Sequence, residues 1–419
     1  MLRFLTAGES HGKALVAVLE GVPAGLAIDL DAITTDLRRR QTGYGRGRRM
    51  LIESDRAEPL SGVRHGLSTG GPIALLIPNK DWENWQRTMH VEPEMPESAS
   101  GVDRPLVTRP RPGHADLAGF VKYGHEDMRN VLERASARET AARVAVGAIA
   151  RQLLRAVGTD VASHVTAIGS ASVSNPLAFS FQQVRAISAE SPLHCADAEV
   201  ELRMIAEIDR ARDAGDTMGG SFEIIAHDVP PGLGSYVQWD RKLDGRLAQA
   251  LMSIPAIKAV GIGLGPAVAH LPGSRVHDEI VPRIDRDSTD PVGVSRPTNN
   301  AGGLEGGVTN GEELRMTAYM KPISTLMKPL RSVDLSNMTE SPATIERRAR
   351  RARREYSYSG KPFAIRRTPS RTPKYAEPAI LFAKMWEESH SAGSAFPACD
   401  NLISMRSARG SGRGRPSNS

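Results

Sequence analysis

The order in which strand-like and helix-like runs follow one another leaves few fold classes open to this chain. Apolar and β-branched runs typical of strands fall at 50–53, 73–77, 161–168, 221–226 and 314–320, and runs with helical periodicity fall at 31–40, 128–157, 199–214 and 243–252. The two kinds of run do not alternate through short loops, as they do in a doubly wound parallel sheet. The sequence therefore predicts an α+β fold built in layers.

Charge divides the chain near residue 347. The sequence has 54 Lys and Arg against 48 Asp and Glu, a net charge of +6, and residues 348–419 contain 15 of the basic and 5 of the acidic residues. The first 347 residues therefore hold 54 − 15 = 39 basic and 48 − 5 = 43 acidic residues, a net charge of −4. Because the basic excess belongs to the C-terminal part, no nucleic-acid partner is expected for the body of the protein.

The same position divides the chain into two predicted parts. Residues 1–347 read as one continuous globular domain, because no Ser- or Pro-rich linker interrupts them. Residues 348–419 are rich in Arg, Ser and Pro, a composition that predicts a poorly ordered tail apart from a short helix over 376–388.

Several classes of protein are not expected. No run approaches the roughly 18–20 apolar residues that span a bilayer, and Glu9 and His11 interrupt the start of the chain where a signal peptide would be apolar. Cys195 and Cys399 are too few for a disulfide framework, and the histidines lack metal-ligand spacing. We therefore expect a cytoplasmic protein with no membrane partner and no metal.

Two arginines lie on helix faces that otherwise point to the core. Arg40 follows Leu37 by three residues on one apolar stripe, and Arg138 lies between Ala135 and Ala142 on another. A buried charge without a partner is strongly destabilising. Each arginine must therefore either form a structural ion pair or line a polar cavity, and the sequence leaves both interpretations open.

Other arginines gather near these helices. They are Arg38, Arg39, Arg46, Arg48, Arg49, Arg104, Arg109, Arg111 and Arg134. Guanidinium groups bind phosphate and carboxylate groups in a bidentate manner, so in a net acidic body this concentration favours a small polyanionic ligand. Glu139 and Arg143, four residues apart, are expected to form only a surface pair.

Two histidines and two loops are candidates for chemistry. His11 lies in Gly8–Gly12 and His114 in 111–116, where neighbouring glycines let a ligand approach and a histidine near neutrality can act as a general acid; a purely structural role is the alternative for either. The remaining nine of the 11 histidines are expected to be structural or exposed. The glycine-rich run 299–307 can present backbone N–H groups to a phosphate or a flat ring, and 321–325 brings an ammonium and hydroxyls together.

Taken together and in this order, these segments resemble the chorismate synthase family. The matching blocks are 8–12, 38–49, 111–116, 134–140, 216–220, 249–257, 299–311 and 320–347. The resemblance implies a β-α-β sandwich assembled as a homotetramer. It also implies the last step of the shikimate pathway in aromatic amino acid biosynthesis, the anti-1,4-elimination of phosphate from 5-enolpyruvylshikimate-3-phosphate. This reaction requires reduced FMN, for which NADPH is one candidate reductant.

The resemblance also implies roles for individual residues. His11 corresponds to the acid that protonates the departing phosphate, and His114 to the group that protonates or steadies the reduced flavin. The implied substrate-binding residues are Arg48, Arg111, Arg134 and Arg347. The implied cofactor-binding residues are Arg40, Arg46, Arg134, Ala135, Ser136, Gln249, Ala250, Gly306, Lys321, Pro322, Ile323, Ser324, Thr325 and Arg347.

The sequence departs from the family pattern directly after Arg347. The family continues Ser-Asp-Val-Cys, whereas this chain continues Arg-Ala-Arg-Arg, so Ala349 stands where the family has an aspartate implied to accept a proton from the flavin. A shifted reading frame, a degenerate copy or a compensating acid would explain the departure, and its abruptness favours the first. We therefore expect impaired catalysis. The alternative functions are a flavin- or anion-binding remnant and, less favoured, an RNA-binding tail.

Overall fold

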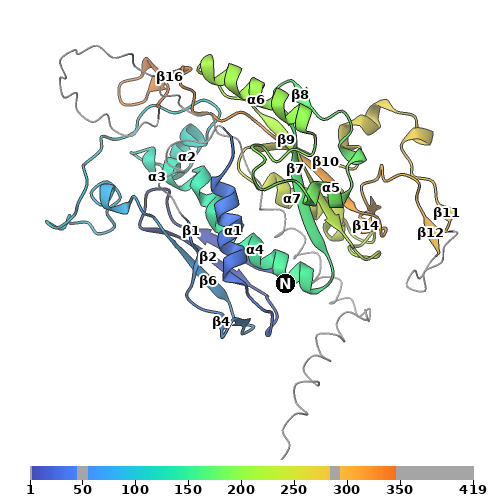
Figure 1. Ribbon diagram of the computed structural model, residues 1–419. Helices are drawn as coiled ribbons and strands as arrows, with labels where there is room; N and C mark the ends of the chain where they lie inside the picture. The colour runs from blue at the N-terminus through green and yellow to red at the C-terminus, as the bar shows by residue number, and fades with distance from the viewer. Residues whose placement is uncertain (1, 45–54, 284–292, 346–419) are drawn as a thin grey trace, which may run out of the picture.

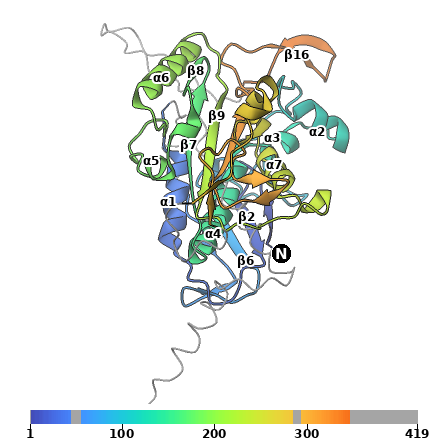
Figure 2. The same ribbon diagram turned by 90° about the vertical axis from the view of Figure 1, so that its right-hand side faces the viewer.

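The computed structural model describes residues 2–44, 55–283 and 293–345. Two antiparallel sheets enclose a layer of helices (Figures 1 and 2). The first sheet has the order β1 (Arg3–Ala7), β2 (Ala14–Glu20), β6 (Ile73–Pro78) and β3 (Glu58–Pro59). The second has the order β10 (Ile257–Ile262), β15 (Leu314–Met320), β9 (Gly220–His227), β7 (Asp160–Ile168) and β8 (Ala171–Ser172). This arrangement confirms the predicted α+β sandwich.

Helix α4 (Thr140–Ala156) forms the centre of the helical layer. It packs on β2 and β6 of the first sheet, on β7 of the second and on α1 (Leu30–Gln41). Eleven of its 17 residues are buried, and many of these are Ala, Gly or Val, whose small side chains let both sheets approach closely. A helix with so wide an apolar face lies between layers rather than on the surface of a protein. Helix α7 (Leu243–Met252) joins this core through Leu243, Leu247 and Leu251.

The outer face of the second sheet is covered by two further helices. Val200, Met204 and Ile208 of α6 (Ala198–Asp213) pack on β7 and β8, and α5 (Phe181–Arg185) packs on β7 and β9. The remaining elements are α2 (Asp116–Tyr123), α3 (Arg129–Arg134) and the hairpins β4–β5 (Val63–Arg64, Leu67–Ser68), β11–β12 (Val281–Pro282, Val294–Ser295), β13–β14 (Leu304–Glu305, Val308–Thr309) and β16–β17 (Arg331–Asp334, Thr339–Pro342).

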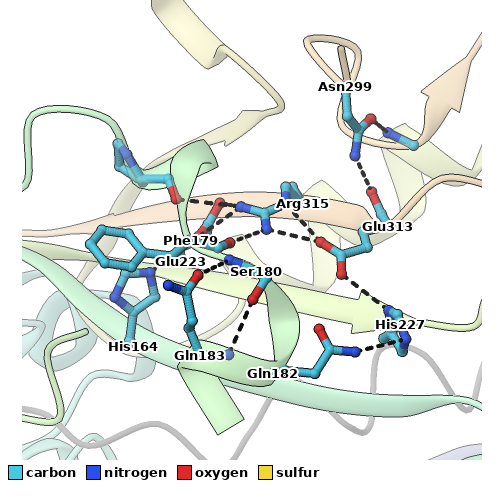
Figure 3. A network of polar contacts seen from close by, with 12 residues as sticks. His164, Phe179, Ser180, Gln182, Gln183, Glu223, His227, Asn299, Glu313 and Arg315 are labelled. Atoms are coloured by element: carbon cyan, nitrogen blue, oxygen red, sulfur yellow. Dashed lines mark hydrogen bonds and ion pairs between the residues drawn. The ribbon is translucent and has the colours of Figure 1, made fainter. Parts of the chain in front are cut away.

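A buried polar network ties this covering layer to the sheet (Figure 3). Arg315 of β15 donates to the carboxylates of Glu223 at 3.2 Å and Glu313 at 2.9 Å, and to the backbone carbonyl of Phe179 ahead of α5. His164 of β7 lies 3.1 Å from Glu223, with none of its side-chain surface exposed. His164 is therefore structural, as the sequence indicated.

Most of the predicted elements are present, and one is wrong. The runs at 73–77, 161–168, 221–226 and 314–320 are strands β6, β7, β9 and β15, and those at 31–40, 199–214 and 243–252 are α1, α6 and α7. The run at 128–157 is not one helix: α3 ends at Arg134, and Ser136 is extended, with φ −69° and ψ 147°. The Ser136 hydroxyl accepts a hydrogen bond from the N–H of Arg138, a local bond that competes with helix continuation.

Two predicted elements, the strand at 50–53 and the helix at 376–388, lie outside the described residues. Within the described ranges, no helix combines the length and the apolar composition that crossing a membrane requires.

Candidate active site

The connection between β1 and β2 carries His11 into a buried position. Gly8 has φ +98°, and a Cβ at this position would lie 2.4 Å from the carbonyl oxygen of Ala14, so only glycine allows the turn. His11 is 8% exposed. Its Nδ1 lies 2.9 Å from both carboxylate oxygens of Glu133 on α3, and its backbone N–H donates to the same carboxylate at 2.8 Å. The pair joins segments 122 residues apart.

An aromatic ring and an arginine complete the surroundings of His11. The indole of Trp85 stacks on the imidazole, with ring centroids 3.8 Å apart and planes inclined by 19°. The guanidinium of Arg104 lies 3.9 Å from the centroid of the Trp85 ring. Burial lowers the pKa of Arg104, and the neighbouring cation Arg129 lowers it further. A positive charge is thus held against the indole that stacks on His11, in a partly desolvated place.

The turn after α3 meets the same loop. The Ser136 hydroxyl donates to the Ser10 hydroxyl at 3.1 Å, and Arg134 donates to the backbone carbonyl and the hydroxyl of Thr6, each at 2.9 Å. Arg134 and Ala135 are exposed, while Ser136 is half-buried. The structure therefore brings three of the predicted site residues to the edge of the His11 loop.

The second predicted histidine forms a similar pair with a carboxylate. His114 Nδ1 lies 2.5 Å from the carboxylate of Asp116, which begins α2 and is 1% exposed. Arg111 donates to Asp116 through its backbone N–H at 3.0 Å and through Nε at 2.8 Å. Burial alone would raise the pKa of Asp116, but the hydrogen bonds from His114 and Arg111 outweigh burial and hold this pKa below its ordinary value. Asp116 is therefore an anion that orients both neighbours.

The segment 321–325 closes this second centre. Arg111 Nη1 donates to the Thr325 hydroxyl at 3.1 Å, and the ammonium of Lys321 donates to the carbonyl of Gly113. Burial lowers the pKa of Lys321, and Lys258 lowers it further. Pro322 is exposed, and Ile323, Ser324 and Thr325 are half-buried. The structure thus brings this segment together with 111–116.

The carboxylates of the two histidine–carboxylate pairs lie on neighbouring helices. Glu133 belongs to α3 and Asp116 to α2, and these short helices contact each other. Gly119 of α2 faces Val131 of α3 so closely that a Cβ on Gly119 would lie 2.7 Å from a methyl group of Val131. This close approach holds both centres on one helix pair.

Arg40 and Arg138 share a buried carboxylate. Arg138 contacts Asp55 at 2.5 and 2.6 Å, and Arg40 contacts it at 3.4 Å while also donating to Thr140 and to the carbonyl of Ala137. Of the two interpretations that the sequence left open, the structural ion pair describes these contacts. A cofactor contact by Arg40 stays a prediction.

The end of α7 is linked to the same region by a chain of hydrogen bonds. Arg143 contacts Glu139 at 3.1 Å and donates to Ser253 at 3.1 Å, and Ser253 donates to the carbonyl of Ala250 at 2.7 Å. Glu139 also accepts from Thr6 at 2.7 Å and is only 8% exposed, so the prediction of a mere surface pair was wrong. Gln249 is exposed at this end of the helix.

The glycine-rich loop is only partly available to a ligand. Asp278 accepts hydrogen bonds from the backbone N–H groups of Asn300 at 2.7 Å and Ala301 at 2.9 Å, so these donors are already used. Gly306 and Gly307 form the two-residue turn between β13 and β14, with φ +62° and +87°. Gly306 is exposed and remains accessible.

Three predicted site residues, Arg46, Arg48 and Arg347, lie outside the described residues. Conversely, the sequence analysis did not single out Trp85 or Glu133, which hold His11, or assign a role to Asp116. Their one signal in the sequence is their position: Asp116 lies in the 111–116 segment with His114, and Glu133 immediately precedes Arg134.

Two histidine–carboxylate pairs set among arginines and a lysine are an arrangement typical of an enzyme. Comparison with known proteins makes this specific. The chorismate synthase family model matches residues 2–352. Chorismate synthases from Desulforudis audaxviator and Moorella thermoacetica are each 56% identical over 347 residues, which is 83% of this chain and 86% and 87% of theirs.

A solved structure supports the same assignment. The crystal structure of a chorismate synthase, 44% identical, superposes with a TM-score of 0.63 over 77% of this chain and 85% of that one. The chain belongs to the chorismate synthase family. Its function is accordingly that of a chorismate synthase, a lyase, and none of these findings favours the impaired remnant.

Proposed function

We propose that this chain eliminates phosphate from 5-enolpyruvylshikimate-3-phosphate in the anti-1,4 sense to give chorismate, with reduced FMN as cofactor. The observation that carries the proposal is the pair of buried histidine–carboxylate contacts on α2 and α3, Glu133 with His11 and Asp116 with His114. Breaking a C–O bond to phosphate calls for a proton donor at the leaving group, and a second titratable group can serve the cofactor.

The surroundings of His11 suit the leaving phosphate. Arg104 beside the His11–Trp85 stack is partly desolvated, and within the described residues its buried Nε has no hydrogen-bond partner. A partly desolvated guanidinium with an unused N–H donor is stabilised by an anion that accepts its hydrogen bonds. Arg134 at the rim of the same loop, and the predicted Arg48, Arg111 and Arg347, supply further positive charge for a substrate with two carboxylates and a phosphate.

The donors around His114 fit a phosphate-bearing flat cofactor. Lys321 offers a partly desolvated ammonium and Thr325 a hydroxyl. Ser136, beside Ser10 at the His11 loop, is a further proposed cofactor contact. Gly113 has no side chain that would fill the space beside Lys321. A Cβ at this position would lie 3.6 Å from the Lys321 ammonium nitrogen. The chemistry that a reduced flavin supplies when bound is reversible donation of an electron. Ala135, Gln249, Ala250, Gly306, Pro322, Ile323 and Ser324 would line the cofactor, with Arg40, Arg46 and Arg347 beside them.

The proposal extends to the assembly of the protein as a homotetramer. Leu5, Ala7, Val16, Val18, Ala74 and Leu76 form one face of the first sheet, opposite the face that packs on α4, and Leu5 is 59% exposed. Strands that are apolar on both faces are typical of sheets covered on both sides. Arg3 and Glu20 lie opposite each other in the register of β1 and β2 at the end of this face. The face therefore carries charges of both signs, which suits contact with a second copy.

We also propose that the catalytic domain ends at residue 347, that residues 348–419 form a separate tail, and that the protein works in the cytoplasm. The family match ends at residue 352, and similarity to each of the two named relatives spans 347 residues, which supports the boundary. NADPH remains a candidate reductant for the flavin.

The test uses the full chain, incubated without oxygen with chemically reduced FMN and the substrate, and follows chorismate by absorbance. Turnover is expected, and a His11→Ala variant should lower kcat by about 10²–10⁴. A paired variant, Arg348→Ser with Ala349→Asp, measures how much the departure after Arg347 reduces the rate. If neither the natural chain nor the paired variant forms chorismate, the proposal is wrong.

A further inference from the structure

Glu133 determines where the proton on His11 lies. Its side chain is 1% exposed, and it receives His11 Nδ1 at 2.9 Å to both oxygens together with the His11 backbone N–H at 2.8 Å. An ionised carboxylate can only accept hydrogen bonds. Nδ1 therefore carries a hydrogen, and Nε2 is the ring atom that can exchange a proton with a substrate.

The ring is also held in orientation. Stacking of Trp85 at 3.8 Å fixes the plane of the imidazole, and the Glu133 backbone carbonyl accepts the N–H of Ser10 at 3.0 Å. Asn79 donates to the carbonyls of Ser10 at 3.2 Å and Gly12 at 2.9 Å, which anchors the loop on both sides of the histidine. The rotation and the position of the ring are thus set by three separate elements of the fold.

Charged groups of both signs surround the stack of His11 and Trp85. Glu133 supplies a buried negative charge in direct contact, and Asp81 supplies a second through the Trp85 indole, at 3.2 Å from its Nε1. The cations Arg104 and Arg129 lie 3.9 and 5.9 Å from the centroid of the Trp85 ring. The carboxylate in direct contact acts at the shorter range.

We propose that Glu133 is a positioning residue for His11, which keeps the proton on Nδ1 and stabilises the charged ring so that Nε2 gives its proton to the departing phosphate. This inference rests on the proposed role of His11. In the step, the Nε2–H bond breaks and an O–H bond forms on phosphate. The ring that remains is neutral, with Nδ1–H still donating to Glu133. Protonation of Nε2 from solvent then restores the charged ring.

A purely structural role for Glu133, as an anchor of the His11 loop, makes different predictions. Glu133→Gln preserves an oxygen that can accept the His11 backbone N–H but removes the charge. Glu133→Asp preserves the charge but shortens the side chain. Glu126 is exposed in the turn before α3, so Glu126→Gln is the matched control for the same chemical change.

The experiment measures kcat and KM against pH for the full-length chain and the three variants. Glu133→Gln is expected to lower kcat about 10²-fold with little change in KM, and to move the alkaline limb of the profile to lower pH. Glu133→Asp should recover part of the rate, and Glu126→Gln should match the natural chain. A Glu133→Gln profile that overlays that of the natural chain would overturn the inference while leaving the proposed function intact.

A second measurement does not depend on turnover. Long-range ¹H–¹⁵N NMR spectra of the imidazole nitrogens distinguish the two tautomers, with His11→Gln used for assignment. The natural chain should show a hydrogen on His11 Nδ1, and Glu133→Gln should lose this preference. A hydrogen found on Nε2 alone at neutral pH would refute the inference even if the natural chain shows no activity.

Discussion

Arg138 and Asp55 form a buried ion pair across 83 residues of sequence, with contacts of 2.5 and 2.6 Å between one guanidinium nitrogen and the two carboxylate oxygens. Both side chains are almost fully buried, at 4% and 2% exposed, and Arg40 contacts the same carboxylate. The pair holds the start of α4 and the end of α1 to the segment that precedes β3. Two arginines on apolar helix faces thus share one buried aspartate.

Removing this aspartate should destabilise the fold. Asp55→Asn removes the buried negative charge that both guanidinium groups contact, and breaking a buried pair in this way costs about 3–5 kcal/mol. We expect a loss of that size in the free energy of unfolding, measured by urea denaturation. Asp213→Asn provides a control, because Asp213 pairs with Arg212 at the surface with 75% of its side chain exposed. Its effect should stay below about 1 kcal/mol, and equal losses in both variants would contradict the expectation.

The thiol of Cys195 should react slowly in the folded protein. Burial raises its pKa to about 11, from an ordinary value of 9.0. The thiolate is the reactive form, so at pH 8 its population should fall about 100-fold relative to an ordinary thiol. In a Cys399→Ser background, labelling with a disulfide reagent should be about 100-fold slower in buffer than in denaturant. Rapid labelling of the native protein would show that the thiol is accessible and unshifted.

The exposed sheet face should determine the assembly state. Leu5→Lys places a charge on β1, the edge strand of the apolar face formed with β2 and β6, and desolvating that charge opposes contact with a second copy. Light scattering after gel filtration should then give a smaller particle than the natural chain. Leu202→Lys is the control, since Leu202 is also exposed, at 68%, but lies on α6. If both variants keep the mass of the natural protein, this face is not the contact.

The sequence predicts the fold class because strand and helix periodicities are local properties. The strands at 161–168, 221–226 and 314–320 and the helix over Leu243–Met252 follow from composition and spacing alone. The break in the run at 128–157 depends on the backbone of Ser136, whose side chain bonds two residues along, and periodicity does not report such a bond. Periodicity alone therefore predicts one helix where the chain forms two, α3 and α4.

The segments that form the site could be predicted from the sequence, but the contacts between residues of different segments could not. His11, His114 and the 321–325 segment stand out by residue type and by the glycines around them. Glu133 contacts His11 across 122 residues, and Trp85 stacks on it from a segment with no helical or strand pattern. Contacts between residues so far apart in the sequence depend on how α3 meets the loop between β1 and β2. They become visible only in three dimensions.

Asp116 should make the stability of the protein depend on acidity. Its pKa in the folded state lies below the ordinary value of 3.8, because hydrogen bonds from His114 and Arg111 outweigh burial. A carboxyl whose folded pKa is lowered stabilises the fold above its unfolded pKa, and this stabilisation is lost as the pH falls below about 4. The natural chain should therefore lose unfolding free energy from about pH 4 downward.

The substitution Asp116→Asn should remove that dependence together with the stabilisation itself. At pH 7 it removes the carboxylate charge that Arg111, 6% exposed, contacts, so the free energy of unfolding should fall by about 3–5 kcal/mol. Below pH 4 the difference between variant and natural chain should shrink, because the natural carboxyl is then protonated as well. Asp103→Asn, which breaks the exposed pair with Arg87, should leave the curve almost unchanged. A constant difference between Asp116→Asn and the natural chain from pH 7 to pH 2 would mean that the charge of Asp116 is not what stabilises this centre.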